Sequence, residues 1–376
     1  MGNSSWSSVE LGEVIDLYDS KRIPLSGKQR AERQGSYPYY GASGIIDYID
    51  DYIFDGRYLL IAEDGENLNS RKLPIAFWGN GKFWVNNHAH IILGKEGIAD
   101  TDFIRHYLLQ ANISGYITGA AQPKLSQGNL RRIQISLPEY DEQLKISSTL
   151  STYDNLIENN NRRIAILEEM AQSLYREWFV KFRFPGHDQC QMVESPLGLI
   201  PEGWEVKTLK KSMELAYGKA LKKADRKGGE VAVYGSGGIG GFHNTALVNG
   251  PCIIVGRKGN VGSIFWCEHD CWPIDTVFYV KSEHSKYYLY FNLLHQTFHN
   301  SDAAVPGLNR ESAYSNKLIL PETEVVAKFD EIIDPMFSQL KNLRAKNENL
   351  KKQRDLLLPK LISGQIDLSQ AEQASA

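Results

Sequence analysis

The sequence predicts an α+β protein made of two strand-rich domains, each followed by a long helix. Three observations predict this fold class. The chain repeats itself internally, the first part of each copy contains strand-like runs, and the second part shows helical spacing of apolar residues. The repeat predicts a pseudo-twofold arrangement, and the matching helices are expected to pair as an antiparallel coiled coil.

A length of 376 residues fits two or three domains rather than one. We expect six segments along the chain. They are a first strand-rich domain over residues 1–140, a helix over 141–183, a linker over 184–199, a second strand-rich domain over 200–321, a second helix over 322–364 and a tail over 365–376.

The internal repeat joins blocks that follow one another in the same order in both halves. Residues 37–45 (YPYYGASGI) match residues 231–239 (VAVYGSGGI), 194 positions later, and the same separation relates 58–65 to 252–259. The separation is 198 between Trp6 and Trp204, 188 between 83–93 and 271–281, and 183 between 119–138 and 302–321. The second copy is therefore shorter, and the losses fall between matched blocks, where surface loops tolerate changes of length.

Within each copy, short β-branched and aromatic runs separated by Gly and Asn predict strands. Examples are residues 58–62, 75–78, 91–93, 253–255 and 277–280. A Leu-Pro pair then precedes each helix, at 137–138 and 320–321, as is common before a helix start. Asp141 and Thr323 are the expected N-caps.

Apolar residues spaced three and four apart predict the seam of the coiled coil. The residues expected to pair the helices are Ile157, Ile164, Leu167, Leu174, Leu340, Leu343, Leu350 and Leu357. Asn160 and Asn347 fall on the same seam, where a buried polar residue can fix the register. Pro335 and Pro359 are expected to break or kink the second helix. Two unrelated amphipathic helices on local cores are the alternative, and their equal placement in both halves argues against it.

Charge and composition exclude some classes of function. Lys plus Arg is 42 and Asp plus Glu is 45, a net charge of −3, which excludes a histone-like basic protein but leaves a local basic face possible. Residues 1–140 carry 14 basic and 16 acidic side chains, whereas residues 200–321 carry 14 and 11. The densest basic run lies between Lys219 and Lys227, and is either a solvated loop or one that contacts phosphates.

The compartment expected from the sequence is a reducing cytoplasm. The four cysteines are too few for a disulfide scaffold of this size. We also find no apolar run of membrane-spanning length and no signal peptide at the N-terminus, so no membrane association is expected.

Several motifs that could carry other chemistry are set aside. Residues 235–240 satisfy G-x-G-x-x-G, but the segment that follows does not read as a helix, so dinucleotide binding is not expected. No Gly-Lys pair is followed by Ser or Thr, and no Pro-Pro pair is present, which argues against a Walker A site and a self-contained amino-group methyltransferase. Cys267 and Cys271 flank His269 and hint at zinc, but buried free cysteines are favoured. His88 and His90 are assigned to strand packing or DNA contact rather than to a metal.

The order of domains and helices, together with local phrases, resembles the specificity (S) subunit of Type I restriction-modification systems. The phrases are GLIPEG (198–203) followed by WEVKTL, YLLIAEDG (58–65), VGRKGNVGS (255–263), LYREWFVKFRFPG (174–186) and LLLPKLISGQI (356–366). The resemblance covers nearly the whole chain. It implies that each strand-rich part is a target recognition domain that reads one half of a bipartite sequence in double-stranded DNA.

The same resemblance implies the partners. The paired helices set the spacing between half-sites and dock two methyltransferase (modification) subunits, which restriction subunits join. The chain itself is then a non-catalytic subunit that binds no cofactor or metal, with S-adenosylmethionine, ATP and Mg expected on the partner subunits. The source is expected to be bacterial or archaeal. A helix of about 40 residues is roughly 60 Å long, enough to hold two domains about one DNA turn, ~34 Å, apart.

Candidate DNA contacts are polar and basic residues on loops that can reach base edges or phosphates. In the first domain they are Tyr40, Ser43, Arg57, Asn67, Arg71, Lys72, Gln122 and Lys124. In the second they are Lys222, Lys223, Tyr234, Ser236, Arg257, Lys258, Asn260, Asn309 and Arg310. The run from Arg257 to Asn260 is the strongest candidate, because it is basic, contains a glycine and directly follows an apolar strand.

Two other functions stay open at this point. The first is a structural coiled-coil scaffold whose β-rich domains bind protein partners. The second is a stand-alone modification enzyme, against which the missing Pro-Pro loop argues. Competition between DNA sequences in the presence of a methyltransferase partner separates the scaffold from a specificity subunit.

Overall fold

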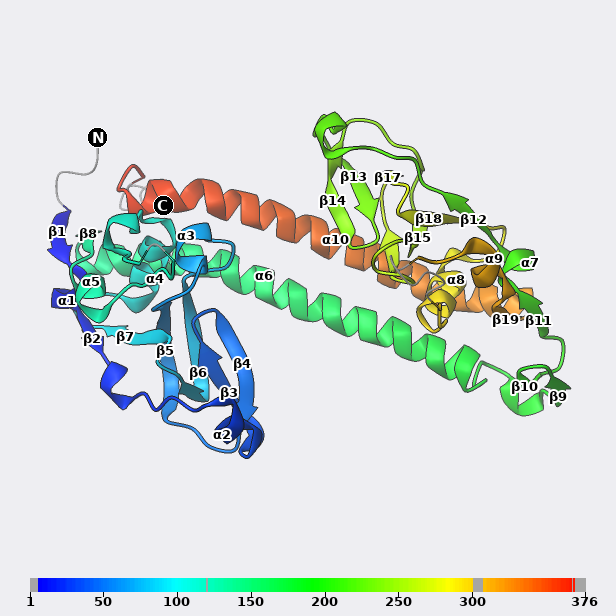
Figure 1. Cartoon of the computed structure of the whole chain (residues 1–376), viewed down its shortest axis with the longest axis horizontal. Helices are drawn as coiled ribbons and strands as arrows, with labels where there is room; N and C mark the ends of the chain where they lie inside the picture. The colour runs from blue at the N-terminus through cyan, green and yellow to red at the C-terminus, as the bar shows by residue number, and fades with distance from the viewer. Residues whose placement is uncertain (1–5, 120, 300–306, 367, 369–376) are drawn as a thin grey trace, which may run out of the picture. The chain divides into compact units, whose positions relative to one another are not determined.

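The computed structural model describes residues 6–119, 121–299, 307–366 and 368 (Figure 1). The chain divides into two compact units, the first formed by residues 1–159 and 347–376 and the second by residues 160–346. The division falls inside both long helices, α6 (Tyr140–Tyr175) and α10 (Thr323–Ile362). Each unit therefore consists of one strand-rich domain and one half of each helix, and the α+β class predicted from the sequence is confirmed.

The first unit is built on a six-stranded sheet in the order β2-β7-β5-β6-β3-β4. Its strands are β2 (Ile15–Leu17), β3 (Gln34–Gly41), β4 (Gly44–Ile49), β5 (Phe54–Ala62), β6 (Ala76–Val85) and β7 (Ala89–Gly94). All neighbours pair antiparallel except β3 and β6, which are parallel. Along β5, Leu59 and Ile61 enter one core cluster and Leu60 another, as alternation along a strand requires.

Short helices and a two-stranded sheet complete the first unit. The two-stranded sheet pairs β1 (Ser7–Glu10) with β8 (Gln134–Leu137). The helices are α1 (Leu11–Val14), α2 (Gly27–Ala31), α3 (Asn67–Ser70), α4 (Thr101–Gln110) and α5 (Gln127–Arg131), with 3-10 turns η1 (Asp19–Lys21) and η2 (Ser114–Tyr116). The main core cluster joins α1, α3, α4 and α5 to α6 and α10.

The second unit divides the corresponding strands between two sheets, in the orders β12-β18-β15-β16 and β14-β13-β17. Their strands are β12 (Glu214–Tyr217), β13 (Val231–Gly235), β14 (Gly238–His243), β15 (Cys252–Gly256), β16 (Ile264–Cys267), β17 (Cys271–Pro273) and β18 (Val277–Lys281). A separate pair joins β11 (Glu205–Thr208) to β19 (Lys317–Leu320). The helices are α7 (Leu209–Ser212), α8 (Lys286–Leu294) and α9 (Arg310–Ser315), with a 3-10 turn η5 (Lys223–Asp225).

The end of the helix predicted over 141–183 and the linker predicted over 184–199 contain other kinds of regular structure. A π-helical turn η3 (Arg176–Val180) follows α6, and Phe182 then takes a left-handed conformation with φ +57°. A 3-10 turn η4 (His187–Gln189) and the hairpin β9 (Met192–Ser195) and β10 (Gly198–Pro201) lead to the second domain. The predicted tail over 365–376 lies mostly outside the described residues.

Strand register confirms the internal repeat. Tyr40 pairs with Ile45 in the hairpin β3-β4, and Tyr234 pairs with Ile239 in β13-β14, each residue 194 positions from its counterpart. Residues 235–240, the G-x-G-x-x-G match, therefore form a hairpin and not a helix start. Further along, the Leu125 amide donates to the Glu63 carbonyl and the Leu308 amide to the Arg257 carbonyl, both at 2.7 Å. The matched block over 302–321 begins in residues outside the described part.

A reciprocal exchange marks the contact between each domain and its helix. Asp100 caps α4, and Ser147 of α6 donates to its carboxylate. In the second unit Ser285 caps α8 and donates at 2.6 Å to Asp330 of α10. Both units therefore have a carboxylate–hydroxyl hydrogen bond at this contact. The carboxylate comes from the domain in the first unit and from the long helix in the second.

Within each unit, the segments of α6 and α10 that contact each other run antiparallel. In the first unit Ile146 and Leu150, near the start of α6, share a core with Leu358 and Leu361, near the end of α10. In the second unit Ile164, Leu167 and Leu174 pack on a cluster that contains Leu340.

The predicted seam residues lie at positions of low exposure along both helices. Of these, Ile157, Leu340 and Leu343 are buried and Leu350 and Leu357 half-buried. Asn347 is only 3% exposed and its side chain donates to the Ile157 carbonyl at 3.5 Å.

Two expected helix caps are wrong, and two expected breaks in the second helix do not occur. Asp141 and Thr323 lie inside the first turns and are not caps, because α6 and α10 begin after Glu139 and Glu322, whose carbonyls accept the first helical hydrogen bonds. Pro335 and Pro359 do not break α10. Buried residues on both sides of each proline hold the helix together, so the packing offsets the one backbone hydrogen bond that each ring removes.

Candidate nucleic-acid interface

Four of the predicted second-domain residues line one hollow of about 300 Å³. Tyr217 comes from the end of β12, Arg257 and Lys258 from the loop after β15, and Asn309 and Arg310 from the start of α9. A β-bridge between Lys258 and Gly307 and the hydrogen bond from Leu308 to Arg257 bring the two loops together. The backbone of the repeat thus gathers side chains that are distant in sequence.

Two guanidinium groups lie against the ring of Tyr217, which is 48% exposed. The Cζ atoms of Arg257 and Arg310 are 5.0 and 4.7 Å from the ring centroid, a distance at which cation–π attraction orients a guanidinium. Arg257 donates one hydrogen bond at 3.0 Å to the Asp275 carbonyl. Because a guanidinium has five N–H donors, this anchoring leaves others for phosphate or base oxygens.

The neighbouring loops are tied to this hollow. Ser263 donates to the carbonyls of Ser236, at 2.7 Å, and Asn260, at 3.0 Å, which connects the β13-β14 hairpin to the loop after β15. Lys258 and Asn260 are exposed. Asn309 caps α9 through its amide oxygen, so only its amide nitrogen is left for a ligand.

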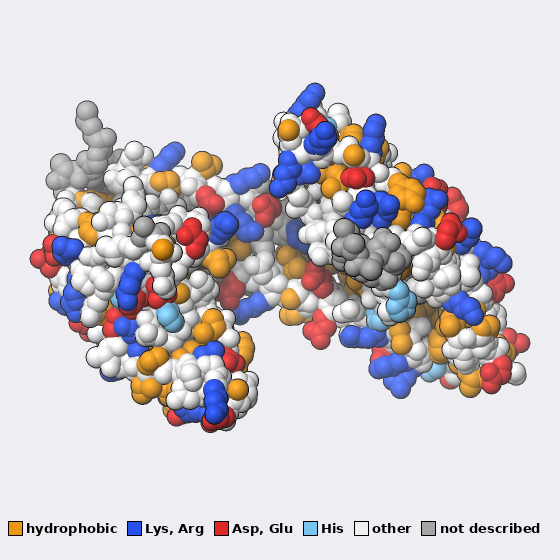
Figure 2. All heavy atoms as spheres, in the orientation of Figure 1, with side chains coloured by type: hydrophobic (Ala, Val, Ile, Leu, Met, Phe, Trp, Pro, Cys, Tyr) orange, Lys and Arg blue, Asp and Glu red, His pale blue; other side chains and the backbone are white. Residues whose placement is uncertain are grey.

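The basic run between Lys219 and Lys227 forms an exposed loop beside β14. Lys222 and Lys223 are exposed, while Arg226 donates to the carbonyls of Gly240, at 2.5 Å, and Leu221, at 3.4 Å. Figure 2 shows Lys and Arg side chains gathered over the part of the second unit that carries β13 and β14. One arginine thus anchors the run and leaves two lysines facing solvent.

The equivalent positions in the first unit hold a buried ionic network instead. By the offsets of the repeat, Asp19 stands for Tyr217, Glu63 for Arg257 and His90 for Phe278. His90 Nδ1 is 2.6 Å from Asp19 Oδ2, and Arg22 bonds to Glu63 at 2.7 Å and to Asp19 at 3.1 Å. Lys124 adds a contact of 3.3 Å to Glu63.

This network does not suit a metal ion, although its three potential ligand atoms lie within 4.8 Å of one another. His90 Nε2 faces the Leu125 carbonyl at 2.8 Å, which can only accept, so Nε2 carries a proton and is no ligand atom, and Nδ1, the other ring nitrogen, already faces Asp19 Oδ2 at 2.6 Å. Both carboxylates are already bonded by Arg22. His90, fully buried, therefore has the packing role expected for it, while His88 lies at the surface, 2.6 Å from Asp64.

Several predicted contacts in the first domain serve the fold. Arg57 forms two hydrogen bonds with Asp102, at 2.8 and 3.0 Å, and lies 3.7 Å over the ring of Trp78. The amide of Asn67 bonds both backbone groups of Leu73 and closes a loop. Arg71 donates to the carbonyls that end α4, and burial lowers its pKa.

Two predicted contacts are core residues. Tyr40 and Tyr234 are each 8% exposed and their rings pack in apolar clusters, because both point inward from the first hairpin strand. Burial raises the pKa of Tyr40. Besides Arg57, whose guanidinium is held by Asp102, the exposed candidates of the first domain are Ser43, Lys72, Gln122 and Lys124.

Sequence reasoning missed Tyr217, Arg22 and Asp19. Tyr217 ends a strand and has no charge, so a search for polar loop residues passes over it. Aligning the copies 198 residues apart would have placed Asp19 opposite Tyr217, and that exchange of charge for an aromatic ring is the available signal.

The outer faces of the helices carry both paired charges and exposed apolar residues. Glu168 bonds Arg344 at 2.6 Å, Arg176 bonds Ser173 at 2.8 Å and Lys351 bonds Glu348 at 3.0 Å, so part of the polar surface is satisfied internally. Large apolar side chains are exposed in both units: Leu156 and Leu356 in the first, Ile166, Met170 and Ile332 in the second. Among the described residues, no helix is long and apolar enough to cross a membrane.

Comparison with known proteins agrees with this arrangement. Residues 3–169 and 201–353 each match the family described as the Type I restriction modification DNA specificity domain. A type I restriction enzyme specificity subunit of Methanocaldococcus jannaschii, MjaIX, is 24% identical over 420 residues, which cover 96% of either chain. A Haemophilus influenzae sequence assigned to the same kind of subunit is 36% identical over 141 residues, about a third of either chain.

A solved structure shows the same fold. The crystal structure of an S subunit of a Type I restriction-modification system from M. genitalium superposes with a TM-score of 0.66 at 18% identity, covering 96% of this chain and 97% of that one. Two family matches, in the order and at the places of the two strand-rich domains, span most of the sequence. The chain therefore belongs to the Type I restriction-modification DNA specificity family, as its sequence phrases indicate.

Proposed function

We propose that each strand-rich domain reads one half of a bipartite target in double-stranded DNA. The observation that carries the proposal is the hollow between β12, β15 and α9, where Arg257 and Arg310 lie against the exposed ring of Tyr217 and Lys258 lines the same hollow. Arginine donors on a rigid backbone suit base edges and phosphates. Because the first domain neutralises the equivalent positions internally, its half-site contacts come from other positions, near Ser43, Lys72 and Gln122.

The chain is proposed to act without catalysing a reaction itself. S-adenosylmethionine, ATP and Mg belong, on this proposal, to methyltransferase and restriction subunits. Two methyltransferase subunits dock on α6 and α10, where exposed Leu156, Ile166, Met170 and Leu356 offer apolar contacts on a surface otherwise rich in paired charges. On this proposal the complex is cytoplasmic and involves no membrane.

Mapping methylated bases in DNA from cells that express the chain with a methyltransferase partner tests the proposal. A single motif with two specified halves and a fixed spacer is the expected result. Binding of protein partners without any DNA sequence preference would instead favour the scaffold function. Methyl transfer by the purified chain alone would contradict the non-catalytic role.

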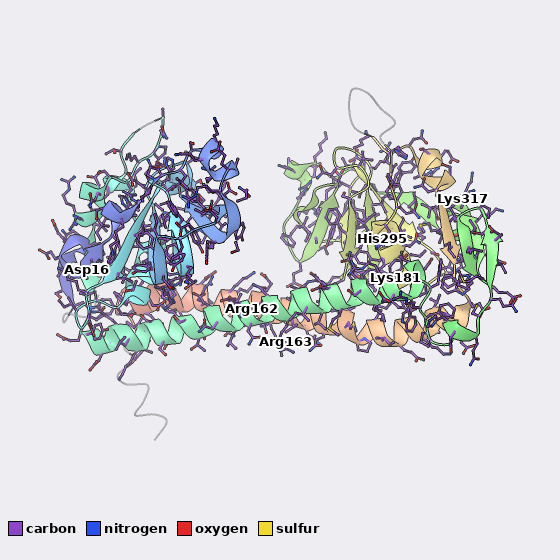
Figure 3. All side chains as sticks on the ribbon, turned by 90° about the horizontal axis from the view of Figure 1, so that it is seen from below. Asp16, Arg162, Arg163, Lys181, His295 and Lys317 are labelled. Atoms are coloured by element: carbon purple, nitrogen blue, oxygen red, sulfur yellow. The ribbon has the colours of Figure 1, made fainter. Side chains whose placement is uncertain are left out.

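The spacer between half-sites is proposed to depend on the helices. Arg162 and Arg163 lie on α6 directly after the division between the units (Figure 3). Inserting residues there should change the spacer and leave both half-sites unaltered. Because ~3.6 residues restore helical phase, insertions of about four and seven residues are the informative lengths. An altered half-site with the same spacer would contradict this role.

A further inference from the structure

Three cysteine thiols meet inside the second unit, at a place that DNA recognition does not use. Cys252, Cys267 and Cys271 are each 3% exposed or less, and their sulfur atoms all lie within 4.8 Å of one another. Cys252 Sγ is 3.5 Å from Cys271 Sγ. Cys190, the fourth cysteine, lies outside this group.

Strand register brings the thiols together. Cys252 pairs directly with Cys267 across β15 and β16. The chain then turns through residues 268–270, and Cys271 opens β17, where its backbone bridges to Val248. Tyr234 on the neighbouring strand β13 packs in the same buried cluster as the three cysteines. Three sulfurs and one tyrosine side chain therefore converge from four strands.

The first unit fills the same place with aromatic rings. By the offsets of the repeat, Tyr58 stands for Cys252, Gly79 for Cys267 and Phe83 for Cys271. Tyr58 and Phe83 contact edge to face, with centroids 6.0 Å apart, and a Cβ on Gly79 would come within 2.9 Å of the Phe83 ring. Packing in the second unit needs only apolar side chains of suitable size. Three soft donors at these positions indicate a ligand as well.

The distances match a thiolate metal site. Zinc binds sulfur at about 2.3 Å with tetrahedral geometry, which places neighbouring sulfurs roughly 3.8 Å apart. We propose that Cys252, Cys267 and Cys271 bind a Zn²⁺ ion, with the Tyr234 hydroxyl or a water as fourth ligand, and that this ion stabilises the second target recognition domain. The site goes beyond DNA recognition, and it does not depend on the proposed function.

Charge and access are consistent with such a site. Three thiolates and one Zn²⁺ carry a net negative charge, which is unfavourable in an apolar interior without a cation nearby. Lys286 is anchored beside the cluster by a 2.8 Å hydrogen bond from its ammonium to the Pro251 carbonyl. Cys252 and Lys286 both line a surface hollow of about 390 Å³, which gives an ion a path to the thiols.

Metal analysis of the purified full-length chain tests this inference. We expect about one zinc per chain, and a thiolate-to-cobalt charge-transfer band after exchange of zinc for Co²⁺. Cys252→Ser and Cys271→Ser should each lower zinc content at least tenfold, whereas Cys190→Ser, outside the cluster, should retain it. Since a variant can lose zinc by misfolding, the wild-type chain gives a second reading: a chelator should raise the reactivity of three thiols and lower the unfolding temperature.

Two results would overturn the proposal. One is wild-type chain that retains no zinc and shows no cobalt band after incubation with the metals. The other is a disulfide between Cys252 and Cys271 in freshly purified protein, detected by mass spectrometry, which would assign the cluster to thiol oxidation instead.

Discussion

The two units share one backbone plan but use its equivalent positions in opposite ways. In the second unit Tyr217 and Arg257 belong to an open hollow, and in the first unit Asp19 and Glu63 belong to a closed network with Arg22 and His90. The same backbone hydrogen bond joins the two loops around each position, from Leu125 to Glu63 in the first unit and from Leu308 to Arg257 in the second. Backbone pairing alone therefore maintains the architecture, and the side chains at its centre can serve either stability or recognition.

Strand continuity differs in the same region. β6 runs without interruption from Ala76 to Val85, whereas the second unit replaces it with β16 and β17. The break follows Cys267, and it divides one sheet into two. A core of large rings thus accompanies the continuous strand, and a cluster of small thiols the interrupted one.

The largest loss of stability is expected on removal of the Asp19 carboxylate. Asp19→Ala leaves Arg22 and His90 without their shared carboxylate in a buried site, and we expect the first unit to lose about 3–5 kcal/mol of unfolding free energy. Tyr217→Ala, at the equivalent exposed position, is the matched control and should change stability far less. Urea unfolding of both variants measures the difference, and equal losses would show that the two positions have the same role.

Acid should affect the first unit through His106. Burial, with a smaller contribution from Arg105, lowers the pKa of His106 to about 4, while the equivalent position of α8, counted from the capping residues, is Phe291. The unfolded chain therefore binds more protons between about pH 4 and 6.5, and the unfolding free energy falls as pH falls through that window, by roughly 3 kcal/mol at 1.36 kcal/mol per pKa unit.

His106→Gln is the variant that tests this pH dependence. It should flatten the loss of stability between pH 7 and pH 4.5, measured by urea unfolding at each pH. Phe291→Leu in the second unit, which has no titrating group at that position, should leave the slope as in the wild type. An unchanged slope in His106→Gln would assign the acid sensitivity to other groups.

A smaller effect is expected for DNA binding. Arg257→Ala and Arg310→Ala should each weaken binding by about 1–3 kcal/mol if the residue contacts a base, and only at the half-site read by the second domain. A lost phosphate contact would instead weaken all sequences alike and flatten the salt dependence. Arg57→Ala, whose guanidinium is held by Asp102, is the matched control.

Competition assays with each half-site scrambled in turn measure this effect. The complex should still assemble with its methyltransferase partner, which separates lost recognition from misfolding. Equal losses at both half-sites would exclude the hollow as the surface that reads DNA.

The smallest change in unfolding free energy is expected for variants of the Asp100–Ser147 pair. Asp100→Ser and Ser147→Asp should each lower the unfolding free energy by about 1–2 kcal/mol, through a lost hydrogen bond or an added carboxylate. Made together, they recreate the arrangement of Ser285 and Asp330 and should come within about 1 kcal/mol of the wild type. Additive losses in the double variant would mean that the two units are not interchangeable here.

Periodicity and repetition could be predicted from the sequence, and tertiary partners could not. The seam residue Leu340 follows from spacing alone, and the matched hairpins follow from the 194-residue offset. Arg57 and Arg71 looked like free loop cations, because Asp102 and the end of α4 are distant in sequence. Cys252 joins Cys267 and Cys271 only through strand register, so the spacing of the last two by themselves did not reveal the group.

The exchanged pair between each domain and its helix has a consequence for inheritance. Two similar stretches in one gene invite recombination with each other. A crossover at the Leu-Pro junctions, residues 137–138 and 320–321, would join the first domain to the second helix and set Asp100 against Asp330, two carboxylates at one site. Selection would remove such a product, whereas replacing a domain together with its own helix keeps acid opposite alcohol. The pair thus favours the exchange of a domain together with its own helix between related genes. It also selects against recombination between the two halves of one gene.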